Sequence, residues 1–211
     1  VVPAGIDPRV APMLTTWRET RSYLQRLGVG GGASVLIVGS GGNGLSFAAH
    51  AALLGATTAA MAGAAPLAEA ARAQAGVTAY VDYKQPDLAA SLRQLVPGGF
   101  DYIVDAVGRA DTAGRVLPCL RPGGKYGTYG MDEHGRVSID PSRAPGAVVL
   151  HPCTYDEAET HQVVTELVLQ GRLTASLWYD CSAAFPLSAI QDAFAHVWSR
   201  RSPKALVQLR A

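Results

Sequence analysis

The chain has 211 residues, of which 48% are hydrophobic and 17% charged, and its formal net charge is +1. This length allows one sizeable core, or one domain and a piece of another, and the small charge argues against nucleic acid or an anionic membrane as a partner. No apolar run approaches the roughly 20 residues that span a bilayer, and the amino terminus lacks the basic and apolar regions of a signal peptide.

The first expected element is a helix over residues 13–27, which ends at Gly28 and the glycine run that follows. Residues 34–38 have the composition of a buried strand, and a glycine-rich turn then leads into a helix that stops at Gly55. The further strands are expected at residues 56–62, 79–83, 100–108, 125–130, 148–150 and 205–209, the further helices at residues 66–75, 88–95, 112–120, 154–169 and 188–198, and a turn at residues 121–124.

Strands that alternate with helices of about ten residues indicate βαβ units and a parallel sheet. Because crossovers between parallel strands are right-handed, the expected fold is α/β, a doubly wound Rossmann sheet with helices on both faces. Ligands of such sheets bind at the carboxyl ends of the strands. The glycine turn, Gly108 and Gly130 all follow strands, so we expect them to converge on one crevice.

The turn after the first strand carries the pattern G-x-G-x-x-G at Gly39, Gly41 and Gly44. In this pattern the first glycine permits the tight turn, the second lets the backbone approach a pyrophosphate, and the third lets the helix pack closely on the strand. The helix amino terminus then offers N–H groups and a positive dipole end to the phosphates. The pattern predicts dinucleotide binding; the alternative is a turn that merely connects a strand to a helix.

Several segments in this order resemble the medium-chain dehydrogenase/reductase superfamily, which includes zinc alcohol dehydrogenases and quinone oxidoreductases. The segments that carry the resemblance are the glycine turn at residues 39–44, the strand DYIVDAVG at residues 101–108, LRPGGK at residues 120–125, FPL at residues 185–187, and KALV at residues 204–207. The resemblance runs from about Ala11 to the carboxyl terminus. It implies hydride transfer between a nicotinamide and an alcohol, carbonyl, quinone or enone.

The same resemblance implies a division of the chain and an assembly. Residues 1–30 would be a linker and leading helix, residues 31–155 the dinucleotide-binding Rossmann domain, and residues 156–211 a segment that returns toward a GroES-like catalytic domain. That catalytic domain is mostly absent from this sequence, so the catalytic residues stay unknown. Family members commonly dimerise through the last strand of the sheet, which makes residues 148–150 the candidate edge of a homodimer or tetramer.

NAD-specific Rossmann domains carry Asp or Glu at the end of the second strand, where it binds the ribose 2′-hydroxyl. Residues 61–65 contain no acid, which favours NADP(H) over NAD(H), although the nearest basic residues are as far away as Arg72 and Lys84. By resemblance, Tyr83 with Lys84 could approach the adenosine end, or form a solvated turn. Lys204 would lie near the pyrophosphate, or be a plain surface lysine. The expected cofactor-binding residues are Gly39, Gly41, Gly42, Asn43, Gly44, Ala62, Gly63, Tyr83, Val107, Gly108, Gly130 and Lys204.

The sequence offers no zinc ligand. In zinc-dependent relatives a cysteine precedes the first Rossmann strand, and this sequence has Thr15 at the matching position, a poor ligand beside Cys, His or a carboxylate. The five histidines show no ligand spacing. Zinc dependence therefore stays open, with a site made wholly by the missing domain as one alternative and a zinc-free enzyme as the other. Arg18, Glu19 and Arg21 form either a solvated helix face or part of a polar substrate pocket.

Two other functions compete with a nicotinamide-dependent oxidoreductase acting on a small molecule. One is a nucleotide-binding module without catalysis, with a redox-sensing or structural role. The other is a different Rossmann enzyme such as a methyltransferase, which would need an acid at the end of the second strand. The widely spaced Cys119, Cys153 and Cys181 fit neither a disulfide framework nor a paired-cysteine metal site, so we expect free thiols in the cytoplasm.

Overall fold

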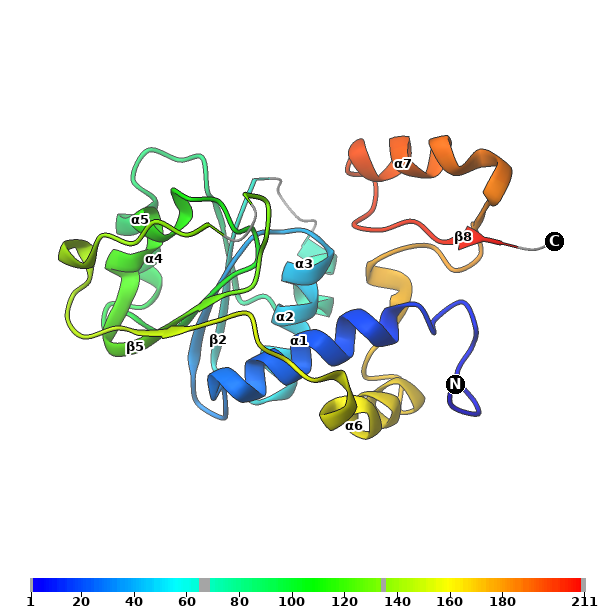
Figure 1. The fold of residues 1–211 in the computed structure, drawn as a ribbon, viewed down its shortest axis with the longest axis horizontal. Helices are drawn as coiled ribbons and strands as arrows, with labels where there is room; N and C mark the ends of the chain where they lie inside the picture. Colours follow the sequence, from blue (N-terminus) through cyan, green and yellow to red (C-terminus); the bar gives the residue numbers. More distant parts are fainter. Residues whose placement is uncertain (1, 65–68, 134–135, 210–211) are drawn as a thin grey trace. The chain divides into compact units, whose positions relative to one another are not determined.

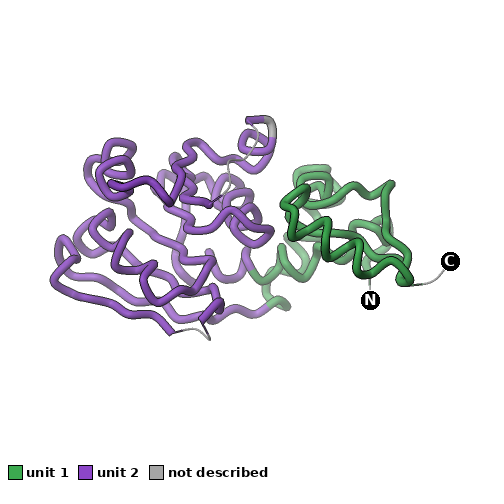
Figure 2. The backbone as a smooth tube through the Cα atoms, turned by 90° about the horizontal axis from the view of Figure 1, so that it is seen from above, with its two compact units in different colours: residues 1–19, 157–211 green, residues 20–156 purple. Residues whose placement is uncertain are grey.

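The computed structural model describes residues 2–64, 69–133 and 136–209, which form two compact units (Figure 2). Unit 1 comprises residues 1–19 and 157–211, and unit 2 comprises residues 20–156. Helix α1 (Met13–Leu27), which has the predicted bounds, contributes its first half to unit 1 and its second half to unit 2. The division at residues 30 and 155 stays a prediction about the domains of a complete family member.

A six-stranded sheet forms the centre of unit 2. Its strands lie in the order β3-β2-β1-β4-β5-β6, and every neighbouring pair is parallel. This order reverses direction at β1 and β4, as in the Rossmann fold, and confirms the predicted fold class. The strands are β1 (Ser34–Val38), β2 (Thr58–Gly63), β3 (Ala79–Asp82), β4 (Phe100–Asp105), β5 (Leu120–Thr128) and β6 (Val149–His151).

Helices cover both faces of this sheet (Figure 1). Helices α2 (Gly42–Leu53) and α3 (Glu69–Gln74) lie on one face, and α4 (Leu88–Leu95) and α5 (Thr112–Val116) lie on the other. The amino-terminal part of the helix expected at residues 66–75, including Pro66, lies outside the described residues. The carboxyl end of α1 accepts two hydrogen bonds from the sheet, from Lys125 Nζ to the Leu27 carbonyl at 2.8 Å and from the Tyr102 hydroxyl to the Gly28 carbonyl at 2.7 Å.

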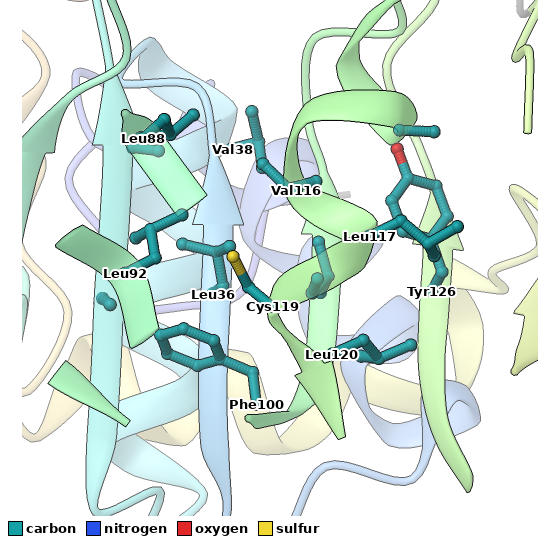
Figure 3. Close-up of a cluster of buried hydrophobic side chains, with 14 residues drawn as sticks. Leu36, Val38, Leu88, Leu92, Phe100, Val116, Leu117, Cys119, Leu120 and Tyr126 are labelled. Atoms are coloured by element: carbon teal, nitrogen blue, oxygen red, sulfur yellow. The ribbon is translucent and has the colours of Figure 1, made fainter. Parts of the chain in front are cut away.

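The core under α4 and α5 follows from the two periodicities of the sequence (Figure 3). Leu36 and Val38, two residues apart on β1, point to the same face of the sheet. Leu88 and Leu92, four residues apart on α4, point back toward them. All four side chains are at most 3% exposed, so this face of the sheet is closed to solvent.

The structure corrects the prediction between residues 112 and 130. The helix expected to reach Leu120 ends at Val116 and continues as a 3-10 turn over Leu117–Cys119. The expected turn at residues 121–124 lies inside β5, whose pairing with β4 jumps from Phe100↔Leu120 to Tyr102↔Lys125. The extra residues bulge out of the ladder between these pairs, so the proline and glycines interrupt the strand without ending it.

Unit 1 contains helices α6 (Glu157–Leu169) and α7 (Ile190–Trp198) and a small parallel pair, β7 (Phe185–Pro186) with β8 (Val207–Gln208). The sequence did not predict β7, and β8 is shorter than the expected strand. Trp17 and Trp178 are buried here edge to face, with ring centroids 5.6 Å apart. Among the described residues, no helix combines the length and hydropathy needed to cross a membrane.

Candidate dinucleotide-binding site

The turn between β1 and α2 has the geometry that its glycines permit. Gly39 has φ +113°, a conformation that L side chains rarely adopt, and its N–H donates to the Ala62 carbonyl at 2.7 Å. A Cβ on Gly39 would lie 2.9 Å from the Val107 side chain. A Cβ on Gly44 would collide with the Gly39 carbonyl, so the close approach of α2 to the turn requires glycine at both positions.

Gly41 differs from the other two glycines of the pattern. It is the amino-terminal cap of α2 with φ −81°, which any residue could adopt, and a Cβ there would have no atom within 4 Å. Neither backbone strain nor protein packing therefore explains the glycine. Gly41 contributes no side-chain cap to the N–H groups of the first turn of α2. This clearance is what a phosphate needs to reach a helix amino terminus.

The loops after β4 and β5 are held together by Asp105, a fully buried residue at the end of β4 whose backbone carbonyl accepts the N–H groups of Tyr129 and Gly130 at 3.0 and 2.9 Å. Its Oδ1 accepts the N–H groups of Val107 and Gly108, both at 2.9 Å, and its Oδ2 accepts the Tyr126 hydroxyl at 2.9 Å. Burial raises the pKa of this carboxyl, and the three hydrogen bonds oppose that shift. Asp105 thus has a structural role.

Gly108 and Gly130 lie against each other in these two loops. Gly108 has φ +80°, and a Cβ on either residue would collide with the backbone of the other loop. The Val107 carbonyl accepts the N–H of Asp132 at 3.0 Å, which ties the loops together further on. The glycine turn, Val107, Gly108 and Gly130 therefore meet at the carboxyl edge of the sheet, as the sequence predicts for a shared crevice.

At the end of β2 the structure shows a crowded glycine. Gly63 is buried, and a Cβ on it would lie 2.5 Å from Ser40 Oγ and 2.5 Å from the Tyr80 hydroxyl. Ala62 contributes its carbonyl to the turn, while its side chain belongs to the core under α4 and α5. Sequence reasoning missed Ser40 and Tyr80, because nothing in their local sequence shows that they meet over Gly63.

Tyr83 follows β3, and its N–H donates to the Gly63 carbonyl at 3.0 Å. Its ring is covered by the guanidinium of Arg115, 4.6 Å from the ring centroid, and Arg115 Nη2 donates to the Tyr83 carbonyl at 2.6 Å. Arg115, on α5, was also missed by the sequence reasoning. Lys84 is exposed, and its N–H donates to Asp82 Oδ1 at 2.9 Å, which closes the turn after β3.

Asn43 lies in the first turn of α2 beside an aromatic cluster. Its Nδ2 donates to the Tyr129 hydroxyl at 3.5 Å. The ring of Tyr129 contacts Phe47 at 4.8 Å and Tyr23 at 5.4 Å between centroids, both edge to face. Tyr23 is fully buried, and burial strongly raises the pKa of its hydroxyl. The residues around Asn43 are thus a packed cluster of rings from α1, α2 and the end of β5.

Arg18, in the charged cluster on α1, is engaged within unit 1. Arg18 Nη2 pairs with Glu157 at 2.7 Å, and Arg18 Nη1 lies 3.3 Å from His161 Nδ1, so Arg18 connects α1 to α6. Lys204, also in unit 1, donates its backbone N–H to the Trp178 carbonyl at 3.0 Å, and burial lowers the pKa of its side chain. Its role near a pyrophosphate stays a prediction.

The described residues do not fit a zinc ion. Among residues 2–64, 69–133 and 136–209, no three His, Cys, Asp or Glu side chains come together as a ligand set. Thr15, at the position that the resemblance assigns to a ligand, is exposed on the first turn of α1. We therefore derive no chemical step through zinc from this chain.

Comparisons with known proteins agree with this geometry. A family model described as zinc-binding dehydrogenase matches residues 42–170, which is more than half of the chain. No curated protein sequence matches the chain significantly. Many solved structures resemble it, among them an alcohol dehydrogenase zinc-binding domain protein from Burkholderia ambifaria, with a TM-score of 0.87 at 22% identity over 100% of this chain and 58% of that one.

Two other solved structures are similar in the same way. Alcohol dehydrogenase TADH from Thermus sp. ATN1 has a TM-score of 0.84 at 21% identity, over 99% of this chain and 62% of that one. A protein from Sinorhizobium meliloti 1021, solved bound to NADP, has a TM-score of 0.75 at 22% identity, over 92% of this chain and 57% of that one. At these identities the likeness shows the fold alone, and the chain spans less than two thirds of each of these proteins.

Proposed function

Because the chain belongs to the zinc-binding dehydrogenase family, within the medium-chain dehydrogenase/reductase superfamily, we propose that it is the dinucleotide-binding part of a nicotinamide-dependent oxidoreductase. The observation that carries the proposal is the open space over Gly41 at the amino terminus of α2. When bound, the nicotinamide supplies or accepts the hydride. The substrate class of the proposal is an alcohol or carbonyl, or a quinone or enone.

Within this proposal each part of the site has one task. The turn at Gly39, Gly41 and Gly44 holds the pyrophosphate against α2, and Gly42 and Asn43 line the first turn of that helix. Asp105 keeps the loops after β4 and β5 together, so that the backbone at Gly108 and Gly130 faces the same edge. The proposed cofactor-binding residues are Gly39, Gly41, Gly42, Asn43, Gly44, Ala62, Gly63, Tyr83, Val107, Gly108, Gly130 and Lys204.

We propose NADP(H) rather than NAD(H) as the dinucleotide. The last residue of β2 is Gly63 where NAD-specific folds carry a carboxylate, so no charge at that position would repel a 2′-phosphate. The Sinorhizobium meliloti protein of similar fold is bound to NADP, which supports the same choice.

We also propose a homodimer that pairs through the edge strand β6. This strand ends the sheet, and Val149 and Leu150 on it are 51% and 54% exposed. Exposed apolar side chains on an edge strand are unusual in a monomeric protein, because such an edge can pair with a strand of another chain.

The experiment that tests the site is a matched pair of glycine substitutions. Gly41→Ala adds a methyl group where the protein leaves room, so we expect it to fold with a loss of about 1 kcal/mol or less and to bind NADPH at least about tenfold more weakly. Gly98→Ala is the control, because a Cβ there also meets nothing within 4 Å and Gly98 lies in the loop between α4 and β4.

Binding is measured by the change in NADPH fluorescence. Equal affinities for the two variants and the unchanged protein would contradict the proposed site. NADPH binding without turnover of any alcohol, carbonyl or quinone by the complete protein would instead support a non-catalytic nucleotide-binding module.

A further inference from the structure

The end of β2 is closed to any side chain. Gly63 pairs with Asp82 in the β2–β3 register, and its missing side chain would point at two hydroxyl groups. One hydroxyl is that of Ser40, in the glycine turn, and the other is that of Tyr80, on β3. Each lies 2.5 Å from the position that a Cβ on Gly63 would occupy, so even alanine would displace them.

In dinucleotide-binding folds, the residue at this position contacts the adenosine ribose. A carboxylate at the end of the second strand accepts the 2′-hydroxyl of NAD(H), while a 2′-phosphate is excluded by its charge. In this chain two neutral hydroxyls occupy that space. A phosphate oxygen only accepts hydrogen bonds, and a hydroxyl can donate one to it. The hydroxyl is also neutral, so it does not repel the phosphate.

The two hydroxyls come from different elements of unit 2. Ser40 lies between Gly39, held through the Ala62 carbonyl, and Gly41, the cap of α2. Tyr80 is within β3, where it pairs with Met61. Their meeting over Gly63 is therefore a property of the turn and the sheet together.

We propose that Ser40 and Tyr80 bind the 2′-phosphate of NADP(H) and thereby select NADP(H) over NAD(H). The inference rests on the proposed function, since it assigns residues of the same site. Asp82 is the neighbouring carboxylate to consider, because it lies opposite Gly63. Its Oδ1 accepts the Lys84 N–H at 2.9 Å, which engages one of its two oxygens in the turn after β3.

The test uses two nucleotides that lack the nicotinamide, 2′,5′-ADP and 5′-AMP, titrated into the full chain by calorimetry. We expect the unchanged protein to bind 2′,5′-ADP more tightly than 5′-AMP. Ser40→Ala and Tyr80→Phe should each weaken 2′,5′-ADP about tenfold, the effect of losing one hydrogen bond to a charged group, and leave 5′-AMP nearly unchanged.

The controls remove a hydroxyl elsewhere. Tyr102→Phe removes the hydroxyl that donates to Gly28, and Ser142→Ala removes an exposed one that donates to Asp140. Both should bind the two nucleotides as the unchanged protein does. Circular dichroism checks that every variant keeps its fold.

Three results would overturn the inference. The first is equal affinity of the unchanged protein for the two nucleotides. The second is an unchanged 2′,5′-ADP affinity in both Ser40→Ala and Tyr80→Phe. The third is a loss of 5′-AMP affinity in Asp82→Asn that exceeds any loss of 2′,5′-ADP affinity in the two hydroxyl variants. The proposed function fails separately, when neither NADPH nor NADH binds the unchanged protein.

Discussion

Asp101 shows how one carboxylate fixes the start of β4 against its neighbours. Its Oδ2 accepts the N–H and the hydroxyl of Ser34 on β1, both at 2.8 Å, and Arg121 on β5 pairs with its Oδ1. Burial alone would raise the pKa of Asp101, but the hydrogen bonds from Ser34 and the charge of Arg121 together lower it below the ordinary value of 3.8. The carboxylate is therefore stabilised in the folded chain.

A carboxyl whose pKa is lowered by folding stabilises the folded state when the pH is above the ordinary pKa of the group. This stabilisation is lost as the pH falls through the folded-state pKa. Asp101→Asn should therefore cost about 1–2 kcal/mol of unfolding free energy at pH 7, and the difference from the unchanged protein should shrink below pH 3.8. Urea titrations over this range measure it. A constant difference at all pH values would contradict the assignment, and Asp111→Asn, which removes no helix-cap hydrogen bond, is the control.

Single residues also show where reasoning from the sequence stops. The reasons for Gly39 and Gly44 are local, because the strand, turn and helix that need them are consecutive. The reason for Gly63 lies in Ser40 and Tyr80, which are 23 residues before it and 17 residues after it. Such a meeting depends on strand order and register, and the pattern of one segment does not contain either.

Among the elements, strand β6 is the one on which the proposed homodimer rests. It pairs with β5 through Lys125, Tyr126 and Gly127, and its other side is the end of the sheet. Leu150→Lys places a charge on the exposed edge, so we expect it to shift the protein from dimer to monomer with a change in unfolding free energy within about 0.5 kcal/mol. Light scattering after size-exclusion chromatography distinguishes the two states.

The matched control for this strand is Leu169→Lys, because Leu169 is 53% exposed on α6 and lies in unit 1. A monomer for both variants and for the unchanged protein would refute the proposed dimer. Dissociation by Leu169→Lys alone would place the interface elsewhere.

At the scale of elements, periodicity predicted most of unit 2. Helices α1 and α4 have the expected bounds, because apolar spacing defines both, and Gly28 follows the first and the run of residues 97–99, Pro-Gly-Gly, follows the second. The prediction failed where one sequence pattern is compatible with two local structures. Pro122, Gly123 and Gly124 are typical of a turn, yet here they form a bulge in β5, since the partner strand β4 continues on both sides. Strand β7 has two residues, too few for any periodic pattern.

The tryptophan side chains, whose fluorescence reports unfolding, are unevenly distributed between the two units. All three tryptophans, Trp17, Trp178 and Trp198, belong to unit 1, whereas the proposed dinucleotide site is built on the sheet of unit 2. Helix α1 carries a buried residue of each unit, Trp17 in unit 1 and Tyr23 in unit 2. Because one continuous helix contributes to both cores, we expect the two units to unfold in one transition.

A ligand that binds only the folded chain stabilises it by mass action, so NADPH at 100 times its dissociation constant should add about 2.7 kcal/mol to the unfolding free energy. For a chain of this size that corresponds to a rise in Tm of roughly 5–10 °C. Circular dichroism follows the secondary structure of both units, whereas tryptophan emission follows unit 1 alone, and the two midpoints should rise together. A rise in the first midpoint alone would show that the units unfold separately, and Gly41→Ala should lower both shifts because it weakens the binding that causes them.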